Sequence, residues 1–257
     1  MTVMERALDA QEMLQLWEAG RNRHPLDRAV QVLSASSPST HAPGLPSVDA
    51  LQRLSVGARD ARLLEVHRST FGDRLDGRAS CPACAESLEV SLTCSTLLAA
   101  GDTSEDDRDT AHLVVVEAGY RVTFRLPDSR DLAAIATLAE VSEARALLLQ
   151  RCVTEVARPG DADPGAPPEA VVLAVAARMA EADPHAELLL DLECPACDTS
   201  WQAPLDVTLF LWARISGQAR RLLLEVDAIA RVYGWREAEI LALSPARRAT
   251  YLELAVG

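Results

Sequence analysis

The chain has no lysine. All 25 of its basic side chains are arginine, and 38 aspartate and glutamate residues outnumber them, which gives a net charge of −13 at pH 7. Nucleic-acid binding depends on basic side chains that neutralise phosphates, so this charge balance argues against a nucleic-acid partner. It also disfavours a zinc-ribbon nucleic-acid binder, even though the chain has the cysteine motifs of a ribbon.

Long apolar runs are lacking as well. No stretch approaches the ~20 apolar residues that a membrane-spanning helix needs, so no membrane span is expected. The first residues, MTVMERALDAQEM, are acidic and amphipathic and do not resemble a secretory signal. Together these observations predict a cytoplasmic location, where the reducing environment favours metal-binding or redox cysteines over structural disulfides.

Motifs of common catalytic sites are absent too. The chain has no G-x-S-x-G, no P-loop and no H-E-x-x-H sequence. Its five histidines are scattered without ligand spacing: His24, His41, His67, His112 and His185. We therefore expect a protein that is not an enzyme.

What the chain does have is a repeated Cys-Pro-Ala-Cys motif, in SCPACAESL at 80–88 and in ECPACDTSW at 193–201. Two residues between paired cysteines let both sulfurs reach one ion from a tight turn, and structural zinc prefers four tetrahedral thiolates. The motifs therefore predict one Zn²⁺ ion bound by four residues: Cys81, Cys84, Cys194 and Cys197. The segment between the pairs is far longer than in an ordinary zinc ribbon, so it is interpreted as an insertion.

Two other interpretations of the motifs stay open at this point. One is a redox dithiol, which would sit at a helix N-terminus whose dipole stabilises the thiolate; the sequences after Cys84 and Cys197 do not start a helix well. The other is a pair of unrelated turns without metal. Cys94 could be a spare ligand, but its leucine neighbours favour a packed thiol, as does the apolar setting of Cys152.

The pattern of apolar residues predicts a mostly helical α+β protein. Helices are expected at 5–20, 24–35, 57–71, within 127–156 and at 169–182; strands at 86–92 and 186–193; and a hairpin at 111–126 that turns at Ala118-Gly119. Loops or linkers are expected at 36–47, 101–109 and 158–168.

The resulting organisation has five segments. They are an N-terminal helical region (1–75), the first zinc knuckle and strand (76–100), an inserted hairpin with helices (101–185), the second knuckle (186–204) and a C-terminal helical module (205–257).

The C-terminal module has the clearest pattern. Apolar residues recur every three or four positions and form one stripe of a long helix, comprising Leu211, Ile215, Ala219, Leu222, Val226, Ile229 and Tyr233. Gly234 is suited to end this helix, and Ser244-Pro245 to begin another.

The tail also resembles a known family. In ARVYGWREAEILALSPARRATYLELAV (230–256), the matching positions are Tyr233, Trp235, Glu237, Glu239, Ile240, Leu241, Pro245, Arg247, Arg248 and Tyr251. This pattern is similar to that of T4-type baseplate proteins, including baseplate hub assembly proteins, of contractile-tail phages and phage-derived contractile injection systems. Residues 54–84 and 124–136 resemble the family more weakly. Arg236 departs from the family at a place where Ser or Thr often caps the helix.

The resemblance implies a non-enzymatic structural or chaperone-like assembly protein that binds other baseplate or hub proteins. It would act at the assembly site in the bacterial cytoplasm or within a phage-like particle. Trp235, Arg247, Arg248 and Tyr251 are the candidate partner-binding residues, because aromatic and arginine side chains are enriched at interfaces. Trp235 and Tyr251 could instead pack internally. The alternative function is a cytoplasmic redox- or zinc-dependent chaperone or regulator that uses the two CPAC motifs.

Overall fold

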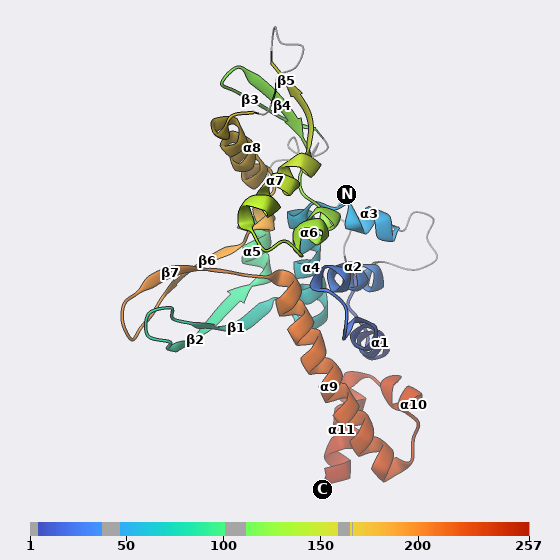
Figure 1. Cartoon of the computed structure of the whole chain (residues 1–257). Coiled ribbons are helices and arrows are strands. Elements are labelled where there is room, and N and C mark those ends of the chain that lie inside the picture. The colour runs from blue at the N-terminus through green and yellow to red at the C-terminus, as the bar shows by residue number, and fades with distance from the viewer. Residues whose placement is uncertain (1–4, 38–46, 101–111, 159–164, 166, 257) are drawn as a thin grey trace. The chain divides into compact units, whose positions relative to one another are not determined.

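The computed structural model of the chain describes residues 5–37, 47–100, 112–158, 165 and 167–256 (Figure 1). Helices predominate and the strands pair in small antiparallel sheets, so the predicted α+β class is confirmed. The loops expected at 36–47, 101–109 and 158–168 lie largely outside the described residues. The five-segment division stays a prediction.

The chain divides into two compact units. The first, here called the helical unit, comprises Met1–Leu45, Leu63–Gly72 and Asp206–Gly257. The second, the mixed unit, comprises Pro46–Arg62 and Asp73–Leu205. One helix, α4(Val56–Phe71), contributes residues to both.

The helical unit is built from the two ends of the chain. Besides the end of α4 it contains α1(Ala10–Gly20), α2(Pro25–Ser36), α9(Val207–Tyr233), α10(Glu237–Leu241) and α11(Pro245–Val256). The first helix begins later than the predicted residue 5, because a capping box fixes its start. The carboxylate of Asp9 accepts the Glu12 amide at 2.8 Å, and the Glu12 carboxylate accepts the Asp9 amide at 3.0 Å.

Helix α9 confirms the predicted stripe. Six of its seven stripe residues are buried, from Leu211 to Ile229, and Tyr233 is half-buried. Gly234 ends the helix in the left-handed conformation with φ 69°, as expected for a C-terminal glycine. The Ser244 hydroxyl accepts the Arg247 amide at 3.3 Å, so it caps α11, and Pro245 is the first residue of that helix.

The mixed unit has its core between a three-stranded sheet and helix α8(Glu169–Ala182). The sheet runs in the order β3(Leu113–Glu117), β4(Tyr120–Phe124), β5(Val153–Ala157). Its hairpin turns at Ala118-Gly119, as predicted. Phe124 and Val122 pack against Val171 and Val175 of α8.

Strand β5 corrects one prediction, since residues up to 156 were expected to be helical. Helices α6(Ser129–Ile135) and α7(Val141–Cys152) occupy most of that segment, but α7 ends at Cys152. Val153, Thr154 and Val156 are β-branched, and this residue type favours the pleated backbone over the helix when a partner strand is available. Here the partner is β4.

A buried carboxylate joins α6, α7 and the end of β4. Asp131 is fully buried, and its oxygens accept hydrogen bonds from Arg125 at 2.9 Å and from Arg151 at 2.8 Å. Burial alone would raise the pKa of Asp131, but the hydrogen bonds from Arg125, the Asp128 amide and Arg151 outweigh it and lower the pKa to about 2.

A second carboxylate anchors the start of α4. Asp183 follows α8 and precedes the short 3₁₀ turn η2(Pro184–Ala186). It accepts the Gly57 amide at 2.9 Å and the Ser55 hydroxyl at 3.0 Å. A Cβ atom at position 57 would lie 2.1 Å from Asp183 Oδ1, so this close approach requires glycine. The preceding helix α3(Val48–Gln52) is capped by Ser47, whose hydroxyl accepts the Ala50 amide at 3.1 Å.

The remaining strands form two separate hairpins. The first hairpin pairs β1(Arg74–Ser80) with β2(Ser87–Thr93) and leads into α5(Cys94–Ala100); the second pairs β6(Leu189–Glu193) with β7(Ser200–Pro204). Strand β1 was not predicted, because its sequence, RLDGRAS, is charged and lacks apolar alternation. The two hairpins together present the two CPAC motifs.

Candidate metal centre

The two CPAC motifs adopt the same loop. In the first hairpin, Cys81–Glu86 joins the paired residues Ser80 and Ser87; in the second, Cys194–Thr199 joins Glu193 and Ser200. We call these the first and second CPAC loops. Each loop is closed by a hydrogen bond from the amide of its first cysteine to the carbonyl of its last residue, 2.9 Å long in both cases.

The chain turns just after the second cysteine of each loop. Ala85 and Asp198 have φ angles of 61° and 54°, in the left-handed region that favours glycine. Their amides donate to the carbonyls of Cys81 and Cys194, both at 2.9 Å. Two loops far apart in sequence therefore share one backbone conformation, which directs both of their sulfurs to the same side.

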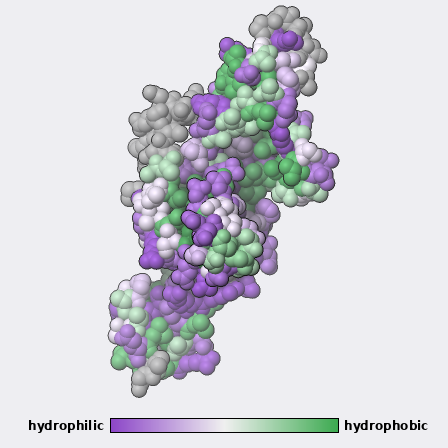
Figure 2. Space-filling view, turned by 90° about the vertical axis from the view of Figure 1, so that its left-hand side faces the viewer, coloured by the Kyte–Doolittle hydropathy of each residue, from purple (hydrophilic) through white to green (hydrophobic). Residues whose placement is uncertain are grey.

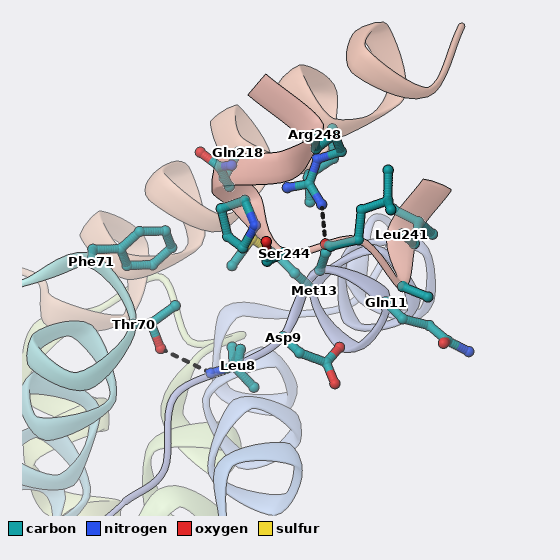
Figure 3. Close-up of a pocket in the computed structure, with 15 residues that line it drawn as sticks. Leu8, Asp9, Gln11, Met13, Thr70, Phe71, Gln218, Leu241, Ser244 and Arg248 are labelled. Atoms are coloured by element: carbon teal, nitrogen blue, oxygen red, sulfur yellow. Dashed lines mark hydrogen bonds between the residues drawn. The ribbon is translucent and has the colours of Figure 1, made fainter. Parts of the chain in front are cut away.

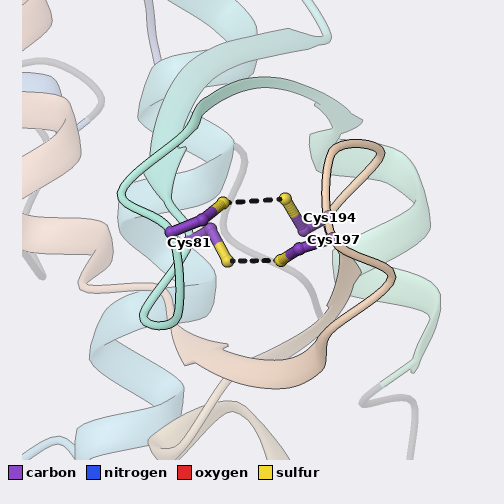
Figure 4. A group of neighbouring side chains, drawn as sticks. Cys81, Cys194 and Cys197 are labelled. Atoms are coloured by element: carbon purple, nitrogen blue, oxygen red, sulfur yellow. Dashed lines mark hydrogen bonds between the residues drawn. The ribbon is translucent and has the colours of Figure 1, made fainter.

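The four sulfurs converge on one point. Cys81 Sγ lies 3.6 Å from Cys197 Sγ, and Cys84 Sγ lies 3.6 Å from Cys194 Sγ. All four sulfurs are within 4.8 Å of one another. Figure 4 shows the two loops facing each other, with the contacts running from one loop to the other. Four thiolates at the usual Zn–S length of about 2.3 Å would be separated by about 3.8 Å, so the observed spacing fits a tetrahedral metal site.

The site is closed on one side and open on the other. The first cysteine of each loop is buried, with Cys81 3% and Cys194 0% exposed, whereas Cys84 and Cys197 are exposed. A metal ion held here would have the protein behind it and would be reachable from one side only.

The thiols affect one another's ionisation. The Thr199 hydroxyl, 3.3 Å from Cys197 Sγ, and the Thr199 amide lower the pKa of Cys197 to about 6. At Cys84 the Glu86 amide acts in the same direction, but contacts with the other three thiols outweigh it and raise the pKa to about 12. Neighbouring thiols resist ionising together because their negative charges repel, and a bound cation removes that repulsion.

Among the described residues, these four cysteines form the cluster of His, Cys, Asp and Glu side chains that could hold a metal ion. The sequence predicts these same four residues as metal ligands, and the structure places all four of their sulfurs close together. Cys94 and Cys152 lie outside the cluster and are fully buried. Burial raises the pKa of the Cys152 thiol to about 11. Thr199 is a neighbour that sequence reasoning missed, although it occupies the position of Glu86 in the other loop.

The surroundings do not provide the usual setting of a redox dithiol. A strand, β2 or β7, follows each CPAC loop. The positive end of a helix dipole, which stabilises the thiolate in redox CxxC motifs, is therefore not placed at either second cysteine.

The candidate partner-binding residues lie in the helical unit and differ in accessibility. Trp235 and Tyr251 are half-buried, with ring centroids 4.8 Å apart, and both pack against Tyr233. Arg248 is buried and pairs with Glu225 at 2.6 Å, whereas Arg247 is exposed. The structure thus gives three of the four residues a role within the fold.

A cavity of about 780 Å³ lies beside these helices (Figure 3). It is lined by the start of α1, the end of α4, the middle of α9 and the turn between α10 and α11. Arg248 borders it and donates to the Leu243 carbonyl at 3.3 Å, and the Thr70 hydroxyl accepts the Leu8 amide at 3.2 Å. Both polar groups are thus engaged within the fold.

Helices of the described segments do not reach the combination of length and apolar character that crossing a membrane requires. On the face shown in Figure 2, hydrophilic residues are spread among the hydrophobic ones.

The fold and the cysteine cluster describe a small α+β protein with a candidate four-cysteine metal centre. Residues 45–163 match the family described as T4 bacteriophage base plate protein. The resemblance to T4-type baseplate proteins is confirmed over this segment, which is a little under half of the chain. It includes the weaker patches 54–84 and 124–136 and the first CPAC loop, but neither the second CPAC loop nor the tail at 230–256. No curated protein and no solved structure matches the chain.

Proposed function

We propose that this chain is a non-enzymatic structural or assembly protein of a phage-type contractile tail or injection-system baseplate, held in shape by one zinc ion. The match of residues 45–163 to the baseplate family supports the biological setting. The observation that carries the zinc proposal is the convergence of four sulfurs within 4.8 Å.

Zinc is the favoured metal because the donor set consists of four thiolates. Soft sulfur ligands in a tetrahedral arrangement are typical of structural zinc, whereas a catalytic zinc retains an open position and usually has His or carboxylate ligands. When bound, the ion would cross-link the loops. Cys81 and Cys194 would hold it from the buried side, and Cys84 and Cys197 would complete the shell at the surface.

The proposed partners are other baseplate or hub proteins, and the proposed place of action is the bacterial assembly site or the particle itself. Arg247 is the exposed member of the candidate partner-binding set and is the residue we expect to contact a partner directly. Trp235 and Tyr251 would act by fixing the helix that carries it, since both rings pack against Tyr233. Hub assembly and chaperone-like activity are part of this proposal.

The partner proposal is tested at the exposed arginine. Arg247→Glu should weaken co-purification with baseplate and hub proteins of a contractile tail that are expressed together with this chain, and the thermal midpoint of the variant should stay unchanged. If no tail protein co-purifies with the wild-type chain, or if Arg247→Glu binds as well as wild type, the proposed contact is wrong.

The zinc proposal is tested by metal analysis of the purified protein, with thiol titration before and after chelation. We expect one zinc per chain and four thiols that become reactive only when the chelator is added. Cys94→Ser serves as the control that should retain the metal.

The alternative function is a cytoplasmic redox- or zinc-dependent chaperone or regulator that uses the two CPAC motifs, and the exposure of Cys84 and Cys197 favours its redox form. It predicts that a glutathione buffer at cytoplasmic potential oxidises the cysteines and releases the metal. Retention of zinc in that buffer supports the structural role, and release supports the redox role.

A further inference from the structure

We propose that, when no metal is bound, the four clustered cysteines oxidise to two disulfides between the CPAC loops, Cys81–Cys197 and Cys84–Cys194. A disulfide within either loop is not the favoured product. This inference rests on the cysteine cluster alone and is independent of the baseplate assignment.

The close sulfur contacts carry the inference. Both 3.6 Å contacts join a sulfur of one loop to a sulfur of the other. A disulfide needs its sulfurs about 2.05 Å apart, so each of these pairs must approach by about 1.5 Å. The backbone hydrogen bonds that close each loop preserve the shape of that loop.

Each bridge would also join one exposed and one buried cysteine. Cys197 is exposed and Cys81 is 3% exposed; Cys84 is exposed and Cys194 is fully buried. An oxidant arriving from solvent therefore reaches one sulfur of each pair first. The second sulfur of the pair then lies behind it, in the position from which it can displace the oxidant.

The chemistry needs a small-molecule disulfide such as oxidised glutathione. The Cys197 thiolate attacks one sulfur of oxidised glutathione, which forms a mixed disulfide and releases one reduced glutathione. Cys81 then loses its proton to solvent and attacks the Cys197 sulfur, expelling the second glutathione as a thiolate that takes up a proton. The two protein thiols lose two electrons, and the glutathione disulfide gains them. A second molecule of oxidised glutathione forms the other disulfide: Cys84 loses its proton to solvent and attacks it, and Cys194 then loses its proton and displaces the remaining glutathione from the Cys84 sulfur.

Either the zinc ion or the two disulfides would link the hairpins. Zinc and the paired disulfides use the same four sulfurs and connect the same two hairpins. A protein that loses its metal in an oxidising medium would thus keep the hairpins joined, whereas disulfides within the loops would leave them apart.

The test uses three double variants that each leave two cluster cysteines, studied metal-free with oxidised glutathione. Cys84→Ser with Cys194→Ser leaves the 3.6 Å pair Cys81 and Cys197. Cys84→Ser with Cys197→Ser leaves the two buried cysteines, one from each loop. Cys194→Ser with Cys197→Ser leaves the pair within the first loop. Circular dichroism of each variant shows whether its helices remain folded.

We expect the first variant to form its disulfide about tenfold faster than the other two. Its sulfurs start 3.6 Å apart, whereas sulfurs of the cluster are up to 4.8 Å apart, and a misplacement of about 1 Å can slow an oriented reaction by up to a hundredfold. The closed loop spans 116 positions, so the product should migrate faster on a non-reducing gel. An equal or faster reaction within the loop would overturn the proposal.

Wild-type protein provides a second readout that does not depend on variants. After chelation and oxidation, trypsin cleavage at Arg78, Arg108, Arg178 and Arg214 should yield peptides 79–108 and 179–214 joined by disulfides, and fragmentation should assign Cys81–Cys197 and Cys84–Cys194. Peptides that remain separate, with intact disulfides inside each loop, would refute the inference. That outcome would leave the zinc stoichiometry, and with it the proposed function, untouched.

Discussion

Chelation of the proposed zinc, with the cysteines kept reduced, should let the two hairpins open and close repeatedly and leave the helical unit folded. The hairpins have little burial to stabilise them. In β6 and β7 every residue is exposed or half-buried, and in β1 and β2 Leu75 is the buried residue. Isolated two-stranded hairpins are at best marginally stable in water, so their order depends on what joins them.

The magnitude follows from the separation of the loops along the chain. Closing a loop of the 116 positions between Cys81 and Cys197 costs about 4 kcal/mol, from 1.5RT times the logarithm of the length. Structural zinc contributes roughly 10–16 kcal/mol in small models. The bound metal would therefore stabilise the joined hairpins by about 6–12 kcal/mol, comparable to the whole stability of an ordinary domain, about 5–15 kcal/mol.

Hydrogen exchange followed by mass spectrometry measures this effect. With the cysteines kept reduced, amides of 74–93 and 189–204 should lose most of their protection on chelation and recover it when zinc is restored, whereas those of α9 should keep theirs. Cys84→Ser should imitate chelation, and Cys94→Ser, close to the first hairpin but outside the cluster, should not. Hairpin amides that stay equally protected without metal would refute the reasoning.

Three further predictions concern the rest of the fold. Gly57→Ala should destabilise the mixed unit by about 1.5–3 kcal/mol in denaturant unfolding, because the new Cβ would displace the hydrogen-bonded Asp183. As a control, Gly217→Ala, in open space on α9, should stabilise the protein by up to about 1 kcal/mol. Equal effects at the two sites would contradict this reasoning. Arg248→Ala should lower the free energy of unfolding by about 3 kcal/mol, because it leaves the Glu225 carboxylate without its partner, whereas Arg247→Ala should change it by no more than about 0.5 kcal/mol. A large loss of stability in the Arg247 variant alone would contradict the structural role of Arg248. Asp131→Asn should lower the free energy of unfolding by about 3–5 kcal/mol near pH 6. Because the pKa of Asp131 is lowered to about 2, the stabilisation by its carboxylate is present above the ordinary Asp pKa and is lost as the pH falls toward 2. The wild-type and variant stabilities should therefore converge in acid, and a stability difference that does not depend on pH would rule out the ion pairs as the cause.

Periodicity and cap residues were enough to predict the helical unit's longest element. The stripe from Leu211 to Tyr233 keeps one period through most of the 27-residue helix α9, and Gly234 marks the end of that helix in both sequence and structure. The period of such a stripe follows from helix geometry, which places every third or fourth residue on the same face. The helix can therefore be recognised from its own sequence.

Elements that depend on a distant partner could not be predicted in this way. Val153–Ala157 becomes a strand because β4 lies beside it, and Arg74–Ser80 becomes a strand because β2 does. Neither sequence carries a decisive local signal. The hydrogen bond from Gly57 to Asp183, 126 positions away, likewise cannot be predicted from the local sequence around either residue.

The sequence predicts some features of the candidate metal centre but not others. The spacing within each CPAC motif predicts a loop that presents two sulfurs, and the repeat predicts that the loops share an ion. The division into buried and exposed cysteines depends on how the loops are placed against the rest of the fold, which the sequence does not encode locally.

The distance between the CPAC motifs also imposes an order of events during synthesis. The second motif leaves the ribosome 110 or more residues after the first, which at ~5–20 residues per second is a delay of about 6–22 s. Throughout that interval a nascent chain displays half of a metal site. Only a chain translated past the second motif can complete the metal site, so a bound ion would distinguish chains that contain both motifs from chains truncated between them.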